Sequence, residues 1–187
     1  LGCGPSTNSH ETQTDDTQTE DTGQDDWNPP SEGRWVPAEW DLQAAVWLVW
    51  PRVYEKDFEP AFAKIVATIL NYEAVHVLAH DNNTLNSAKA ALSSHGGLSD
   101  AVINGEPTAA GFSLVWENIP NDSAWMRDTG PVYVVEDGQL RIQDWGFDAW
   151  GGAFGNFPFA NDDAVPVGVS ESTALPLDTV NLVHERG

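Results

Sequence analysis

The chain has 187 residues, 41% of them apolar, so it has material for one ordinary hydrophobic core, and two large domains are not expected. Its 8 lysine and arginine residues are opposed by 29 aspartate and glutamate residues, which gives a formal net charge of −21. Because phosphate binding depends on clustered cations, this balance argues against nucleic acid as a partner and favours cationic small molecules.

Residues 1–33 differ in composition from the rest of the chain. They are rich in Asp, Glu, Ser and Thr, they contain no Lys or Arg, and their only apolar side chains are Leu1, Cys3 and Trp27. Such a segment cannot bury enough surface to offset the entropy lost on ordering. We therefore predict a disordered acidic tether over residues 1–33 and a folded part over residues 34–187.

The first residues indicate a lipid anchor. Leu1, Gly2 and Cys3, followed by the polar tether, resemble the end of a bacterial lipoprotein signal peptide, in which the cysteine is lipidated. Acyl chains on Cys3 would hold the chain at a membrane, and the tether would extend the folded part away from it. We therefore expect lipid anchoring in the bacterial cell envelope, with membrane contact only through Cys3. A cytoplasmic protein with a cysteine in a random tail is the alternative.

The folded part is expected to begin with a strand and then a helix. Residues 44–50 are a continuous apolar run closed by Pro51, which is typical of a strand buried on both faces. Apolar side chains then recur at helical spacing over residues 55–71. The pattern repeats with a strand over residues 74–79 and a helix over residues 83–94.

The rest of the chain is predicted to consist mainly of strands. They are expected over residues 112–116, 131–136, 139–145 and 177–183. Asp137 and Gly138 lie between two of these strands and are a strong signal for a two-residue hairpin. The stretch over residues 151–176 is predicted to be loop. Alternating strands and helices followed by a hairpin predict a mixed α/β (α+β) fold.

Two segments gather side chains that are typical of a binding site. Residues 121–131 place charged groups and an indole in a loop before a strand, where functional groups are often found. The alternative interpretation there is a surface ion pair between Arg127 and Asp122, which would contribute little. Residues 144–152 alternate aromatic side chains with glycines, which permit tight turns and close backbone approach. We expect these aromatic residues both to fill a core corner and to wall a pocket.

Four short motifs occur in a fixed order along the chain. They are PAEW at residues 37–40, VWLVWP at 46–51, WMRDTGP at 125–131 and WGFDAWGG at 145–152. Together they resemble the agmatine deiminase and Porphyromonas-type peptidyl-arginine deiminase family, over residues 34–187. The resemblance implies a partial pentein fold, a fan of ββαβ modules around a central channel, of which the chain would form roughly the first two to three modules.

The resemblance also implies a chemistry. The family hydrolyses a guanidinium group to a ureido group and ammonia through a Cys thiolate, without a metal or an organic cofactor. Asp128 matches the guanidinium-binding carboxylate of the family, and Trp125 would line the same pocket. A carboxylate holds a planar guanidinium through two parallel hydrogen bonds, and an indole face adds about 0.5–2 kcal/mol of cation–π attraction. Asp148, Trp150 and Glu185 are further candidates for substrate binding.

The sequence departs from the family pattern at several positions. The family's nucleophilic Cys and His-x-Asp pair have no counterpart, because the only cysteine is Cys3 and no histidine is followed two residues later by Asp. Asp148 stands where the family usually has Asn, and Gln43 where many members have His. We therefore expect that the sequence is truncated and that its 187 residues alone have no deiminase activity.

Three functions are considered. The first is hydrolysis of agmatine to N-carbamoylputrescine, a step in putrescine biosynthesis, with a peptidyl-arginine side chain as the alternative substrate. The second is a non-catalytic cation-binding lipoprotein, and the third, suggested only by nine Trp residues, is a carbohydrate-binding module that the motif order disfavours. A shared metal at His76 and His80 is not expected, since four residues along a strand separate them by ~13 Å. The sequence does not indicate an oligomeric state.

Overall fold

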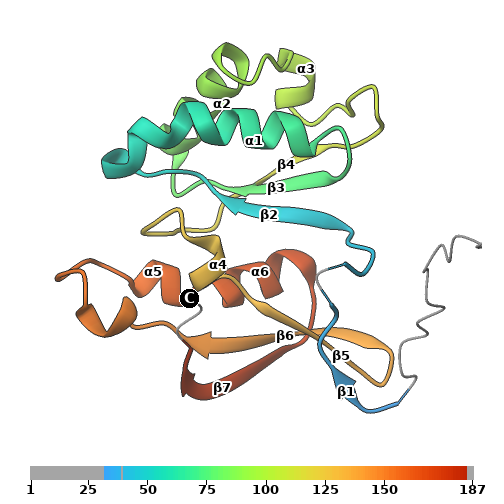
Figure 1. Cartoon of the computed structure of the whole chain (residues 1–187), viewed down its shortest axis with the longest axis vertical. Coiled ribbons are helices and arrows are strands. Elements are labelled where there is room, and N and C mark those ends of the chain that lie inside the picture. Colours follow the sequence, from blue (N-terminus) through green and yellow to red (C-terminus); the bar gives the residue numbers. More distant parts are fainter. Residues whose placement is uncertain (1–31, 39, 185–187) are drawn as a thin grey trace, which may run out of the picture.

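Two β-sheets lie one above the other, with helices on the outer face of the upper sheet and between the two sheets (Figure 1). This computed structural model describes residues 32–38 and 40–184. Cys3, Glu185 and most of the predicted tether therefore lie outside the described residues. Within the described residues, no helix is long and apolar enough to cross a membrane. The predicted mixed α/β fold class is confirmed.

The upper sheet is parallel throughout. It consists of β2 (Ala45–Val49), β3 (Ala74–Leu78) and β4 (Leu114–Glu117), in the order β2-β3-β4. Parallel neighbours need a long crossover. The first crossover contains the 3-10 helix η1 (Val53–Phe58) and α1 (Glu59–Ile69), and the second contains α2 (Asn82–Ser94) and α3 (Asp100–Ile103). These helices cover the outer face of the sheet (Figure 1).

The strands of the upper sheet contribute side chains to a core on each face, as the apolar run over residues 44–50 predicted for β2. Leu48 and Val77 pack on one face in a core with α1 and α2. Val49 and Leu78 pack on the other face, in a second core that includes Ile142 of the lower sheet. Because successive side chains of a strand point to opposite faces, a continuous apolar run lets one strand contribute to both cores.

The lower sheet has the order β1-β5-β6-β7. Its strands are β1 (Arg34–Trp35), β5 (Val132–Glu136), β6 (Gln139–Gly146) and β7 (Leu177–Val183). Strands β5 and β6 form the predicted antiparallel hairpin, with φ of 50° at Asp137 and 77° at Gly138, as a type I′ turn requires. Strand β7 runs parallel to β6, so β5, β6, α6 and β7 form one ββαβ module.

The prediction of a loop over residues 151–176 is wrong between residues 160 and 173. The structure forms α5 (Ala160–Asp163) and α6 (Val165–Thr173) there. Helix α6 contains Gly168 and three valines, which lower helix propensity, and Pro166, which is tolerated in the first turn but hides the helical pattern in the sequence. It is stabilised by tertiary packing, because Val165 and Val169 lie one turn apart and are fully buried between the sheets.

Candidate functional site

The connection from β4 to β5 brings the first candidate residues into place. It ends in the short helix α4 (Met126–Thr129), which carries Asp128 and follows Trp125 directly. The helix ends at Gly130, whose N–H donates to the carbonyl of Met126 at 2.8 Å. A Cβ at Gly130 would lie only 2.5 Å from that carbonyl oxygen, so this turn requires glycine for space.

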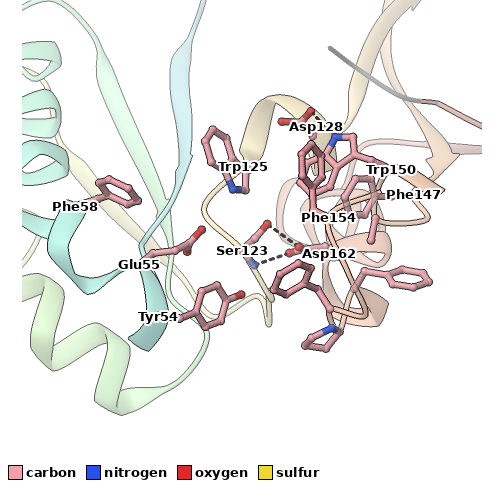
Figure 2. Close-up of a pocket in the computed structure, with 14 residues that line it drawn as sticks. Tyr54, Glu55, Phe58, Ser123, Trp125, Asp128, Phe147, Trp150, Phe154 and Asp162 are labelled. Atoms are coloured by element: carbon pink, nitrogen blue, oxygen red, sulfur yellow. Dashed lines mark hydrogen bonds between the residues drawn. The ribbon is translucent and has the colours of Figure 1, made fainter. Parts of the chain in front are cut away.

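A pocket of about 540 Å³ lies where η1, α4 and residues 147–162 meet (Figure 2). Its walls are mainly aromatic and also carry three carboxylates. The aromatic side chains are Tyr54, Phe58, Trp125, Phe147, Trp150, Phe154, Phe157 and Phe159, and the carboxylates are Glu55, Asp128 and Asp162. An apolar pocket with a few convergent polar groups is the usual form of a small-molecule site.

Two of the three carboxylates are engaged with the backbone. Glu55 is 7% exposed, and its side chain accepts hydrogen bonds from the backbone N–H groups of Arg52 at 3.2 Å and Ala124 at 3.3 Å. Asp162 is 2% exposed and accepts from the backbone N–H groups of Asp122 at 2.7 Å and Ser123 at 3.2 Å. These acids hold the loop before Trp125 in place.

Asp128 is the carboxylate that remains available to a ligand. It is half-buried, and Oδ1 accepts a hydrogen bond of 3.2 Å from the indole Nε1 of Trp150. No described residue donates a hydrogen bond to its Oδ2. Asp128 therefore has an oxygen that can accept from a bound cation at the wall of the pocket (Figure 2).

The aromatic residues form a connected cluster on one side of this carboxylate. The rings of Phe147 and Trp150 meet edge to face at 5.1 Å between centroids, and those of Trp150 and Phe154 at 5.5 Å. Phe147 is buried, whereas Trp125 is 55% exposed at the opposite wall. Residues 144–152 thus fill a core corner with Phe147 and line the pocket with Trp150.

The electrostatic character of the pocket is negative. Burial, together with the nearby charges of Glu55 and Asp162, raises the pKa of Tyr54 to about 12. Burial is the larger cause and the two carboxylates add to it, so a negative charge on the Tyr54 oxygen is unfavourable. The carboxylates of Glu55, Asp128 and Asp162 in the pocket wall favour a cationic ligand.

The structure brings together only some of the predicted site residues. Asp128, Trp125 and Trp150 line one pocket. Asp148 does not line it; its Oδ1 accepts from the backbone N–H of Gly151 at 2.8 Å, within the turn. Glu185 and Cys3 lie outside the described residues.

The alternative ion pair between Arg127 and Asp122 is wrong. Asp122 is buried and accepts hydrogen bonds from the backbone N–H and the side-chain Nδ2 of Asn161, both at 2.9 Å. Its nearest cation is Arg52, with Nη1 3.9 Å from Oδ1. Arg127 is exposed on α4. The loop over residues 121–131 is therefore anchored by its buried acid rather than by a surface pair.

The two histidines considered as metal ligands have different partners. Nδ1 of His76 lies 2.7 Å from Oε1 of Glu117, and its ring stacks on Trp47 at 4.2 Å. His80 accepts instead from the backbone N–H of Asn121 at 3.2 Å. Across the part of the chain that the structure describes, no group of three or more His, Cys, Asp or Glu residues could hold a metal ion.

Local sequence pattern does not reveal several residues of the pocket. Glu55 is an acid within a segment whose apolar spacing predicts a helix, and Asp162 lies where a loop is predicted. Each of the two acids reaches a backbone N–H group from a distant part of the chain, that of Ala124 for Glu55 and that of Asp122 for Asp162, and no local pattern indicates such a contact. The run of phenylalanines at residues 154–159 was the one available sign of an aromatic wall.

Comparison with known proteins agrees with this geometry. A family model described as Porphyromonas-type peptidyl-arginine deiminase matches residues 35–187. The agmatine deiminase of Pseudomonas aeruginosa (strain LESB58) is 37% identical over 146 residues, which cover 73% of this chain and 35% of that protein. The chain thus spans about a third of the length of that relative.

Solved structures of agmatine deiminases also superpose on this chain. The agmatine deiminase of Enterococcus faecalis superposes with a TM-score of 0.64 at 26% identity, over 83% of this chain and 40% of that one. The C. jejuni agmatine deiminase, solved with substrate bound, superposes with a TM-score of 0.64 at 19% identity, over 82% of this chain and 41% of that one. These matches confirm the partial pentein fold. The chain belongs to the Porphyromonas-type peptidyl-arginine deiminase family.

Proposed function

We propose that this chain supplies the guanidinium-binding part of a deiminase that hydrolyses agmatine to N-carbamoylputrescine and ammonia. The observation that carries the proposal is the Asp128 carboxylate, which has an oxygen free of hydrogen bonds from described residues in an acidic, aromatic pocket. A guanidinium is planar and cationic, and a carboxylate can accept two of its N–H groups at once.

The contribution of the described residues to such a reaction is binding and orientation. Asp128 would hold the guanidinium plane and so place the central carbon for attack, and the indole of Trp125 would contact the cation. Attack in this family requires a thiolate, and the only cysteine of the chain is Cys3, in the predicted tether. We therefore assign no bond-forming step to the described residues.

Agmatine is favoured as the substrate by the names of the relatives. The Pseudomonas aeruginosa protein and the Enterococcus faecalis structure are both agmatine deiminases. The family model is named for peptidyl-arginine, which supports an arginine side chain as the alternative substrate. Cation binding without turnover is the second candidate function, and it is favoured by the acidic, aromatic lining of the pocket, which suits a bound cation whether or not it is turned over.

The Asp128→Asn substitution tests the proposal. We expect agmatine to bind the 187-residue chain and the variant to bind it about 10- to 100-fold more weakly, because hydrogen bonds to charged groups contribute about 1.5–3 kcal/mol. Isothermal calorimetry measures both affinities. Asp148→Asn is the matched control, since Asp148 lies outside the pocket lining and Asn keeps an acceptor for Gly151. Equal heats of agmatine binding for the wild type and Asp128→Asn would show that Asp128 does not bind the guanidinium. Formation of the ureido product by the chain alone would contradict the expected lack of deiminase activity.

We also propose that Cys3 carries the lipid that anchors the protein in the cell envelope. The support is the Leu-Gly-Cys sequence followed by an acidic tether. When the protein is produced with its natural N-terminus, radiolabelled palmitate should be incorporated into the wild type and lost in Cys3→Ser. Equal labelling of the two proteins would be evidence against lipidation at this position.

A further inference from the structure

We infer that Trp150 is a positioning residue: a left-handed turn aims its indole N–H at Asp128 and so orients that carboxylate for a planar guanidinium. The inference rests on the proposed guanidinium binding. It assigns Trp150 a different role from the substrate contact expected from the sequence, because the polar group of its side chain is directed at Asp128.

The backbone around Trp150 adopts an uncommon conformation. Four consecutive residues, Ala149, Trp150, Gly151 and Gly152, have φ of 56°, 56°, 63° and 74°. Glycine adopts the left-handed region freely, but residues with a Cβ adopt it at a cost in conformational free energy. Such strained positions persist only where the surrounding structure holds them, and they gather at functional sites.

Hydrogen bonds hold this turn on both sides. Asp148 accepts from the backbone N–H of Gly151 at 2.8 Å, and the backbone N–H of Gly152 donates to the carbonyl of Ala149 at 3.1 Å. The residue before the turn is tied to α5, because the N–H of Phe147 donates to Oδ1 of Asp163 at 2.7 Å. The side-chain oxygen of Asp148 thus serves the turn, a role that the amide oxygen of an Asn could also fill.

Aromatic contacts fix the ring itself. Phe147 and Phe154 both meet the indole of Trp150 edge to face, at interplanar angles of 87° and 88°. These edge-to-face contacts favour one orientation of the indole. The indole N–H can therefore remain on Oδ1 of Asp128, which leaves Oδ2 and the second lone pair of Oδ1 for the two N–H groups of a guanidinium (Figure 2).

Orientation matters for a guanidinium more than for an ammonium. A guanidinium presents a rigid, planar set of donors, and it gains most from a carboxylate that lies in its own plane. An ammonium is a compact charge that accepts many directions of approach. A residue that only orients Asp128 should therefore affect guanidinium binding selectively.

The hydrogen bond can be tested without any ligand. In the ¹H–¹⁵N NMR spectrum of the 187-residue chain, the indole resonance of Trp150 is identified by its loss in Trp150→Phe. We expect this resonance to move upfield in Asp128→Asn, because a neutral amide replaces the charged acceptor. The indole resonance of Trp145, whose Nε1 donates to Gln143 at 3.1 Å, should stay in place. A Trp150 resonance unmoved by Asp128→Asn would overturn the inference.

The positioning role is tested by comparing agmatine with 1,4-diaminobutane. Trp150→Phe keeps a ring between Phe147 and Phe154 but removes the N–H. We expect it to weaken agmatine binding about 5- to 10-fold and to change diaminobutane binding less than about twofold, in calorimetry. Trp145→Phe, which also removes one indole N–H, should change neither affinity. Equal losses for both ligands, or unchanged agmatine binding, would overturn the positioning role.

These outcomes are separable from failure of the proposed function. If the wild type and Asp128→Asn bind agmatine equally well, Asp128 is not the guanidinium ligand and the proposed function fails. The NMR comparison still decides whether Trp150 holds Asp128, because it requires no ligand.

Discussion

Trp50→Ala is expected to lower the free energy of unfolding by about 4–5 kcal/mol, because a fully buried indole is removed and a cavity remains. Trp50 is 0% exposed, follows β2 directly and packs edge to face on Phe62 of α1 at 6.2 Å. Its Nε1 also donates to Oε1 of Glu59 at 3.0 Å. That oxygen accepts as well from Ser87 of α2 at 2.7 Å, so the indole is joined to α1 and α2, the two longest helices that cover the upper sheet.

Urea denaturation followed by far-UV circular dichroism measures the effect. Trp125→Ala is the matched control, since it deletes the same side chain where more than half of it is exposed. Trp125→Ala should lower the free energy of unfolding by less than about 1 kcal/mol, because less of this side chain is buried. Equal midpoints for the two variants would show that the upper core does not depend on Trp50.

The local sequence predicted those elements of the fold that show a strong hydrophobic pattern or depend on the residues of a tight turn. The apolar run that ends at Trp50 identified β2 because a strand buried on both faces needs apolar side chains at every position. The hairpin between β5 and β6 was predictable from Asp137 and Gly138, which accept positive φ. Helix α6 was not predictable in this way, because burial of Val165 and Val169 stabilises it although its sequence has a low helix propensity.

The candidate site likewise contains some residues that a local motif identifies and others that it does not. Asp128 and Trp125 stood out because they lie within one short motif, and the structure places both in one pocket. Glu55 and Asp162 did not, since Ala124, which donates to Glu55, lies 69 residues away along the chain, and Asp122, which donates to Asp162, lies 40 residues away. The role of Asp148 was also beyond local pattern, because a carboxylate next to Trp150 can face a ligand or cap a turn, and only the backbone conformation decides between them.

Asp162→Ala is expected to destabilise the chain by about 3 kcal/mol. The buried carboxylate accepts through Oδ1 from the backbone N–H groups of Asp122 and Ser123 and through Oδ2 from the Ser123 hydroxyl, at 2.7 to 3.2 Å. Each buried donor left without a partner costs about 1–3 kcal/mol. Asp122 in turn accepts from Asn161, so the loop before Trp125 and the start of α5 hold each other reciprocally. Losing Asp162 should therefore also displace Trp125 and weaken agmatine binding.

Asp162→Asn separates the hydrogen bonds from the charge. Both backbone N–H groups donate to the same oxygen, Oδ1, which an amide carbonyl can replace, while the amide NH₂ can donate to the Ser123 hydroxyl. We expect this variant to lie within about 1 kcal/mol of the wild type and to keep agmatine binding. If alanine and asparagine prove equally destabilising, the hydrogen bonds of Asp162 are not what holds the loop.

The pH dependence of the unfolding free energy, compared between the wild type and Asp162→Asn, gives an independent check. Burial raises the pKa of Asp162 above its ordinary value of 3.8, although the hydrogen bonds from Asp122 and Ser123 oppose the shift. The native state therefore holds this proton more tightly than the unfolded chain. Its contribution to stability is fully present below pH 3.8 and is lost as the pH rises through the raised pKa. Asp162→Asn lacks this loss, so its unfolding free energy relative to the wild type should increase from pH 4 to neutrality. A difference that stays constant over that range, in urea denaturation at each pH, would mean that burial does not shift the titration of Asp162.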